Sequence, residues 1–168
     1  MNTYKYIFLL FAFALLTRCT VQYSMGGANI APDVNTISIQ DFSNRAPGGP
    51  ANLGQYFTNE MKDKFQSQTR LTLVNERGDL NFSGEITDYE TRPVSVGGEQ
   101  TAQMTRLSIT VHVRYNNEKH PDNSFESNFS QYEDFDASQN LSSVEDRLVE
   151  DISKKLIKKK KKKAVVNW

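Results

Sequence analysis

Residues 105–115, Thr-Arg-Leu-Ser-Ile-Thr-Val-His-Val-Arg-Tyr, decide the fold, because polar and apolar side chains alternate without exception from Arg106 onward. A period of two is typical of a strand with one buried and one open face. The residues predicted to face the core are Leu107, Ile109, Val111, Val113 and Tyr115. We therefore predict that a sheet is built around this strand.

Four other segments are predicted strands, because they are short, apolar or alternating, and bounded by turn residues. They are Thr36–Gln40, Leu71–Val74, Leu80–Glu90 and Phe125–Tyr132. Polar turns or loops are expected at Arg45–Pro50, Asn75–Asp79, Pro93–Gln100 and Asn116–Asn123, and the third of these forms a hairpin.

Two segments carry apolar residues three or four positions apart, which is the spacing of one helix face. We predict one helix from about Asn52 and another from about Ser143 that fades within the lysines. Each has a candidate capping box, Asn52 with Gln55 and Ser142 with Glu145. The two apolar stripes are Leu53, Tyr56, Phe57, Met61 and Phe65, and Val144, Leu148, Val149, Ile152 and Leu156.

The order of these elements is strand, helix, a run of strands, helix. It predicts an α+β domain in which two helices pack on one face of a mostly antiparallel sheet of four to five strands. The first strand–helix–strand unit would be a right-handed crossover if its strands are parallel. A single domain over residues 36–168 is large enough to hold one sizeable core.

The N-terminus has the pattern of an export signal. An unbroken apolar run, Ile7–Leu16, ends just before Cys19, the only cysteine, and it is too short to span a bilayer. Leu16-Thr17-Arg18-Cys19 resembles a bacterial lipobox, although Arg18 stands where that pattern has a small residue. We predict a lipoprotein signal peptide over residues 1–18, acylation (palmitate included) at Cys19, and a tether over residues 19–35. A free thiol in a longer cleaved signal and an uncleaved interfacial helix are the alternatives.

Charge is distributed unevenly along the chain. Residues 19–150 contain ten Lys or Arg and nineteen Asp or Glu, whereas residues 151–168 contain eight lysines and only Asp151. A basic tail can bind acidic lipid or another polyanion. Nucleic acid is not an expected partner of an exported chain whose body lacks interleaved basic and aromatic residues. The lysine run is equally consistent with a solvated helix end and with a contact to lipid headgroups or lipopolysaccharide.

No set of residues indicates catalysis, a metal or a cofactor. His112 is predicted on the outward face of the strongest strand, and His120 in a turn, and neither has partners at zinc-ligand spacing. Glu133, Asp134 and Asp136 could offer oxygen ligands to calcium but lack the spacing of a calcium loop. We expect a protein that is not an enzyme, with no cofactor and no metal site.

Several stretches, taken in order, resemble the LptE family, the lipoproteins of the outer-membrane lipopolysaccharide translocon, in the form found in Bacteroidetes. Besides the lipobox, they are Ile37–Phe42, Leu71–Val74, Gly78–Leu80, Gly84–Tyr89, Arg106–Val111, Phe129-Ser130 with Phe135, and Val166-Asn167-Trp168. The oligolysine run departs from the family pattern. The family fold is two helices on one face of a sheet of about four strands, which agrees with the order of elements above.

Members of this family lie inside the large β-barrel LptD as a plug and assembly partner, and they bind lipopolysaccharide. The resemblance therefore implies a lipoprotein anchored through its acylated N-terminus on the periplasmic side of the outer membrane. Its implied partners are an LptD-like barrel and lipopolysaccharide. The alternative is a generic periplasmic lipoprotein that binds another envelope partner.

Candidate contact residues follow from this resemblance. Arg92, Arg106 and Lys158 could donate charge-assisted hydrogen bonds to lipopolysaccharide phosphates. The alternative for Arg106 is a cross-strand ion pair, and for Arg92 a solvated hairpin position. The candidate partner contacts are Pro93, Gly97 and Gly98 in the expected hairpin loop and Trp168 at the end of the chain. Trp168 could instead pack the last helix onto the sheet.

Overall fold

A computed structural model describes residues 30–96 and 102–166. Its centre is an antiparallel meander of three long strands, β4 (Leu80–Val96), β5 (Ala102–Asn117) and β6 (Phe125–Asp136). The alternating stretch at 105–115 lies within β5, and all five residues predicted to face inward are buried. The short 3-10 helix η2 (Pro121–Asn123) connects β5 to β6.

Three shorter strands extend the sheet beyond β4. β1 (Thr36–Ile39) lies between β3 (Thr72–Val74) and β4 and is parallel to both, and β2 (Ser43–Asn44) pairs in parallel with β4 further along. The sheet is therefore mixed, with six strands rather than the expected four to five, and its main order is β3-β1-β4-β5-β6. The parallel edge arises because α2 returns the chain beside β1.

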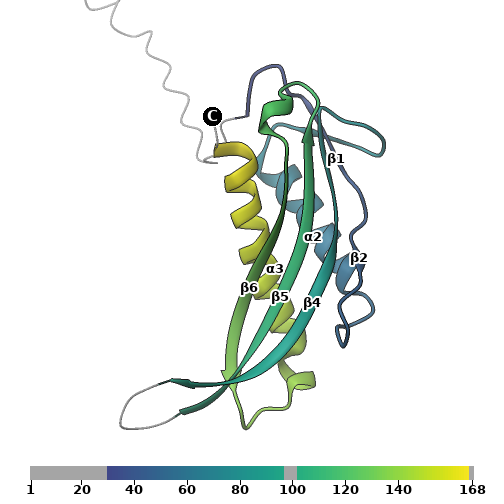
Figure 1. The fold of residues 1–168 in the computed structure, drawn as a ribbon. Coiled ribbons are helices and arrows are strands. Elements are labelled where there is room, and N and C mark those ends of the chain that lie inside the picture. The colour runs from purple at the N-terminus through teal and green to yellow at the C-terminus, as the bar shows by residue number, and fades with distance from the viewer. Residues whose placement is uncertain (1–29, 97–101, 167–168) are drawn as a thin grey trace, which may run out of the picture.

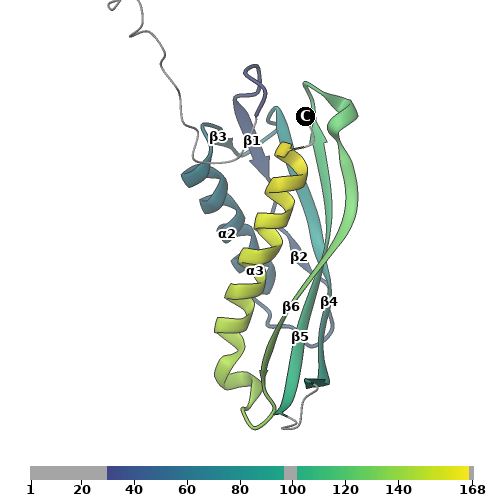
Figure 2. The ribbon, with the colours of Figure 1, turned by 90° about the vertical axis from the view of Figure 1, so that its left-hand side faces the viewer.

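Both helices cover the same face of the sheet, as Figures 1 and 2 show, which confirms the predicted α+β class. α2 spans Leu53–Gln68 and α3 spans Leu141–Val166. The buried apolar side chains of α2 are Leu53, Phe57, Met61 and Phe65, and those of α3 are Leu148, Val149, Ile152, Leu156 and Ile157. Burial of each large apolar side chain stabilises the fold by about 1.5–3 kcal/mol, which is why the stripes dock on the sheet. No helix among the described residues is long and apolar enough to cross a membrane.

A chain of aromatic contacts links α2 to all three long strands. Phe65 lies 5.2 Å from Phe82 between ring centroids, Phe82 lies 4.7 Å from Tyr115, and Tyr115 lies 5.1 Å from Phe125. Phe125 then contacts Phe129 edge to face at 6.1 Å. Burial raises the pKa of Tyr115 to about 12, so its phenol stays neutral in the core. These rings form one continuous core from the helix layer to the edge strand.

The start of α2 packs unusually close to the link between β1 and β2. A Cβ placed on Gly54 would lie 2.2 Å from the Phe42 carbonyl oxygen, so only glycine fits without a shift of the backbone. One turn later, the buried Thr58 hydroxyl accepts a hydrogen bond from the Phe42 N–H (2.9 Å) and donates to the Gly54 carbonyl (2.8 Å). The helix is thereby fixed against this link by backbone contacts as well as by its apolar stripe.

The two predicted capping boxes are wrong. Asn52 makes no side-chain capping hydrogen bond at the start of α2. At the start of α3, the side chain that caps the helix belongs to Asn140 rather than Ser142. Asn140 Oδ1 accepts a hydrogen bond from the backbone N–H of Ser142 (3.2 Å). Glu145 accepts a hydrogen bond from the Tyr89 hydroxyl instead of returning to the helix start.

Several element ends also differ from the prediction, and those of β4 and α3 bear on the candidate contact residues. β4 continues past Glu90 to Val96, so Arg92 and Pro93 lie in a strand rather than in a loop. Beyond its pairing with β2, β4 is an edge strand, and proline is tolerated there because no central ladder is interrupted. α3 does not fade within the lysines but continues to Val166, since lysine is a good helix former.

Candidate functional site on the open polar face of the sheet

The face of β4, β5 and β6 that points away from the helices is polar. Because side chains alternate along a strand, the residues between the buried ones of β5 lie on this face. They are Arg106, Ser108, Thr110, His112 and Arg114. No described element covers this face in Figure 1, where the three strands lie in front of both helices. We call it the open polar face.

Arg106 and Arg92 lie side by side at the β4–β5 hairpin end of the open polar face, because they are directly opposite in the strand register. Arg106 binds Asp134 through two hydrogen bonds, Nε to Oδ1 (2.7 Å) and Nη2 to Oδ2 (2.9 Å), and this is the cross-strand ion pair considered for it. Arg92 binds Glu90 of its own strand in the same bidentate way, at 2.6 Å for both bonds. Each arginine lowers the pKa of the carboxyl group it binds.

The Arg106 guanidinium also stacks on an aromatic ring. Its central carbon lies 3.7 Å from the ring centroid of Tyr132, which is 48% exposed. Cation–π stacking and a bidentate carboxylate together hold this side chain in one orientation. The result is a rigid platform of one cation and one exposed ring.

A second charged cluster lies in the middle of the face around His112. Its Nδ1 lies 2.7 Å from Asn128 Oδ1 and its Nε2 lies 2.8 Å from Glu126 Oε1, while Arg114 Nη2 also donates to Glu126 Oε1 (2.9 Å). Hydrogen bonds to Asn128 and Glu126 raise the pKa of His112. Hydrogen bonds from Arg114 and His112 lower the pKa of Glu126 to about 2. The cluster therefore favours a protonated imidazole beside an ionised carboxylate.

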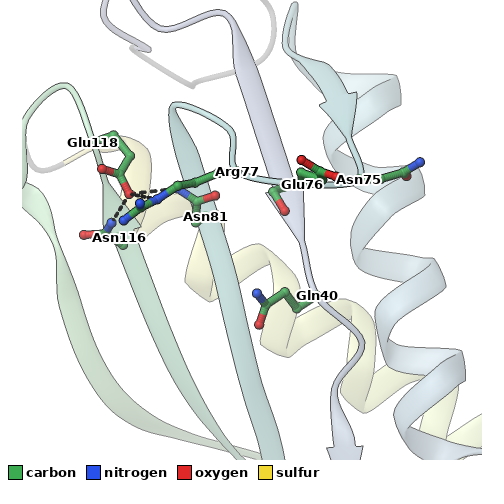
Figure 3. Close-up of a pocket in the computed structure, with 8 residues that line it drawn as sticks. Gln40, Asn75, Glu76, Arg77, Asn81, Asn116 and Glu118 are labelled. Atoms are coloured by element: carbon green, nitrogen blue, oxygen red, sulfur yellow. Dashed lines mark hydrogen bonds and ion pairs between the residues drawn. The ribbon is translucent and has the colours of Figure 1, made fainter.

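Shallow hollows lie at the other end of this face, where β1 pairs with β4 and β5 lies on the far side of β4. The larger one has a volume of about 380 Å³ and is lined by side chains that include Gln40, Asn75, Asn81 and Asn116, with Arg77 and Glu118 (Figure 3). Glu118 Oε1 accepts hydrogen bonds from Arg77 Nε (3.0 Å) and Asn116 Nδ2 (2.6 Å). An adjoining hollow of about 330 Å³ shares Gln40 and extends to His112 and Arg114. Together these side chains offer hydrogen-bond donors and acceptors but no apolar pocket.

The structure brings together only two of the three residues predicted to contact lipopolysaccharide. Lys158 is exposed on α3, in the helix layer on the opposite side of the sheet from Arg92 and Arg106. Pro93 is exposed in β4 beside Arg92. The other predicted contact residues, Gly97, Gly98 and Trp168, and the predicted acylation site Cys19, lie outside the described residues.

The three carboxylates considered for calcium do not converge. Glu133 pairs with Lys155 of α3, Asp134 pairs with Arg106 on the open polar face, and Asp136 accepts from the Ser138 hydroxyl. Among residues 30–96 and 102–166, no group of three possible metal-binding side chains occurs.

Sequence reasoning missed the cluster of Arg114, Glu126 and Asn128 and the ring of Tyr132. A signal was present, because these residues occupy the polar positions of two alternating strands. The pairing of β5 with β6 decides which of them meet, and this register is not visible in either strand alone.

Comparison with known proteins identifies the family of this sheet-and-two-helix domain. The model of the family LptE, lipopolysaccharide-assembly, matches residues 34–159, from just before β1 into α3. The chain belongs to the LptE family. This family is a non-enzymatic family of lipoproteins in the Gram-negative envelope, and the chain has a role in lipopolysaccharide assembly. The Bacteroidetes form of LptE stays a prediction.

Solved structures show the same fold at low sequence identity. A minor lipoprotein from Acinetobacter baumannii is 12% identical, with a TM-score of 0.52 over 80% of this chain and 94% of that chain. A hypothetical protein from Chlamydia trachomatis is also 12% identical, with a TM-score of 0.55 over 80% of this chain and 99% of that chain. No curated protein matches the sequence. The same fold is therefore shared while most side chains differ.

Proposed function

We propose that this LptE-family protein is an outer-membrane lipoprotein, acylated at Cys19, that plugs an LptD-like β-barrel from the periplasmic side and assists its assembly. The observation that carries the proposal is the family match across residues 34–159, which spans the whole sheet and most of both helices. The lumen of a large transmembrane barrel is polar, and a plug needs a matching exterior. The open polar face supplies such a polar exterior, and each of its arginines is paired with a carboxylate, so that its charges are largely balanced.

Within this role, Arg92 and Arg106 are the proposed contacts to lipopolysaccharide. Each holds a carboxylate through two parallel hydrogen bonds, and the same fork fits a phosphate oxygen pair. A phosphate can therefore replace Glu90 or Asp134 without reorienting the guanidinium. Tyr132 adds a flat apolar surface beside the bound phosphate.

The remaining predicted contacts are placed around this surface. Pro93 lies next to Arg92, and we propose that it, Gly97 and Gly98 contact the barrel. We propose the same for Trp168. Lys158 lies in the helix layer, so a contact to lipopolysaccharide there involves a different part of the ligand from the one held by Arg92 and Arg106.

The first experiment isolates the protein with its partner from native membranes. An affinity tag is placed in the exposed turn at 137–139 between β6 and α3, and the protein is recovered in mild detergent beside a Cys19→Ala control. We expect one stoichiometric, heat-modifiable outer-membrane barrel with the parent, and loss of outer-membrane fractionation with the control. Recovery of the protein alone, or with soluble partners only, would support the generic periplasmic lipoprotein instead.

The second experiment tests the proposed contacts with purified lipopolysaccharide. The double variant Arg92→Gln/Arg106→Gln should bind at least about tenfold more weakly, because a hydrogen bond to a charged group contributes about 1.5–3 kcal/mol. The matched control is Arg77→Gln, which removes an exposed arginine with one carboxylate partner at the other end of the sheet. Equal losses in both variants, or no loss in the double variant, would exclude this site.

A further inference from the structure

The C-terminal end of α3 is a segment of regular helix made almost entirely of lysine. Ile157 is the last buried apolar side chain among the residues whose side chains are described, and Lys158–Lys163 follow on the same helix, which continues to Val166. Successive residues of a helix are rotated by about 100°, so six consecutive positions go around the whole axis. The run therefore occupies positions all around the helix axis rather than along one side of it.

Among the described side chains, the first lysine of this end has no carboxylate partner. Nearer the start of α3, Lys154 pairs with Glu150, and Lys155 pairs with Glu133 of β6. Lys158 is exposed, and among the described residues no carboxylate lies within 4 Å of its Nζ. No Asp or Glu follows Asp151 in the sequence. An anionic partner from outside the chain would complement this charge.

The lysine end lies at the same end of the molecule as the start of the described chain. Figures 1 and 2 both show the C-terminal end of α3 beside the segment that begins at residue 30, with the β4–β5 hairpin at the opposite end. Cys19 precedes Ile30 by eleven positions. That many residues reach at most about 35–40 Å. A lipid on Cys19 would therefore lie within this reach of residue 30, which is at the lysine end of the molecule.

We propose that the lysine-rich end of α3 docks on an anionic phospholipid surface and acts as a second membrane attachment beside the acylated Cys19. One acyl chain holds a protein only marginally, and stable anchoring takes a second signal such as a polybasic patch. Each lysine near an anionic surface contributes about 1 kcal/mol. The chain then ends in Ala164-Val165-Val166-Asn167-Trp168, and tryptophan is favoured at the membrane interface.

Two attachments at one end also orient the molecule. With the lysine end and Cys19 at the membrane, the β4–β5 hairpin and the neighbouring Arg92 and Arg106 point away from the phospholipid surface. This docking does not depend on a barrel partner, so it can be tested separately from the proposed function.

The test uses the chain from residue 19 onward with Cys19→Ala, since every residue of the described core lies within residues 30–157. Binding is measured by co-sedimentation with vesicles of phosphatidylcholine containing about 30% phosphatidylglycerol. Changing Lys158–Lys163 to glutamine should weaken binding by at least about 100-fold, the equivalent of roughly three lysines at the surface. Changing the same six residues to arginine should preserve it.

Three controls separate surface docking from other causes. A variant with Arg45→Gln, Lys64→Gln and Arg77→Gln loses charge elsewhere and should bind like the parent, and about 0.5 M salt should abolish binding. Far-UV circular dichroism checks that each variant stays folded. Trp168 is the only tryptophan, so its quenching by brominated phospholipid reports directly on the end of the chain.

The outcomes are distinct. The proposal is supported if the glutamine variant loses vesicle binding, the arginine variant keeps it, and brominated phospholipid quenches Trp168. Equal binding of the glutamine variant and the parent overturns it, as does equal binding to vesicles of phosphatidylcholine alone. Binding only to vesicles that contain lipopolysaccharide also overturns it, because the lysines would then contact the transported lipid rather than the phospholipid surface.

Discussion

His112 shows how the open polar face depends on single side chains. It is bonded through both ring nitrogens, to Asn128 and to Glu126, and these bonds raise its pKa. The folded state thus holds the proton more tightly than the unfolded chain, whose histidine has a pKa of about 6.5. The stabilisation is fully present below that pH and is lost as the pH rises through the raised pKa of the folded state.

The stabilising contribution of Glu126 depends on pH in the opposite direction. Its pKa of about 2 lies below the ordinary glutamate value of 4.5, so its stabilising contribution is present above about pH 4.5 and is lost as the pH falls towards 2. The contributions of His112 and Glu126 to the stability of the folded state are therefore both fully present between about pH 4.5 and pH 6.5.

Substitution of either partner should lower the pKa of His112. We expect Asn128→Ala and Glu126→Gln each to move it towards 6.5, because each variant removes a hydrogen bond that favours the protonated ring. Titration of the His112 ring signals by NMR measures this directly. Ser130→Ala, at an exposed position of β6, the strand that carries Glu126 and Asn128, should leave the titration of His112 unchanged. An unchanged pKa in both partner variants would mean that the cluster does not hold the proton.

At the scale of the element, helix and strand ends are where local patterns predicted least well. The sequence pattern predicted Ser142 as the cap of α3, and Asn140 two positions earlier has an equally suitable side chain. In the structure Asn140 precedes the helix and Ser142 lies inside it, and Glu145 accepts a hydrogen bond from Tyr89 of β4. A contact between distant segments thus occupies the carboxylate that the predicted capping box would have used.

The cap of α3 can be tested with two single substitutions. Asn140→Ala should lower the free energy of unfolding by about 1 kcal/mol, the typical value of an N-cap. Ser142→Ala should change it by less than about 0.5 kcal/mol, as is usual for exposed positions. Urea denaturation of both variants and the parent gives the comparison. A larger loss with Ser142→Ala would restore the capping box predicted from the sequence.

At the scale of the whole molecule, the two helices and the sheet share one core. Phe57 and Phe65 of α2 and Leu148, Ile152 and Leu156 of α3 belong to a single buried cluster that includes the inward residues of β4, β5 and β6. Among the side chains that the structure describes, neither helix has a separate core of its own. Both layers should therefore form and unfold together.

We expect one cooperative unfolding transition with the same midpoint by far-UV and near-UV circular dichroism. Leu156→Ala, at a fully buried position of α3, should destabilise the protein by about 2–5 kcal/mol and move both midpoints together. Lys154→Ala, at an exposed position on the same helix, serves as the control. Separate midpoints for helix and tertiary signals would show that α3 unfolds independently of the sheet.

The sequence by itself determined the buried side of both helices and of β5, and the order of helices and strands apart from the two-residue β2. It did so because periods of two and of three to four residues are local properties, and Leu107–Tyr115 or Leu148–Leu156 carry them without reference to any other segment. Resemblance of ordered short stretches was also enough to indicate the LptE family.

Only the tertiary structure decided which residues meet. Arg106 binds Asp134 and lies beside Arg92 because of strand registers, and Lys158 lies across the sheet from both because α3 returns over the other face. The parallel β1–β3 edge and the shared location of the lysine end and residue 30 likewise depend on how distant segments pack. Such contacts join residues far apart along the chain, so no local pattern contains them.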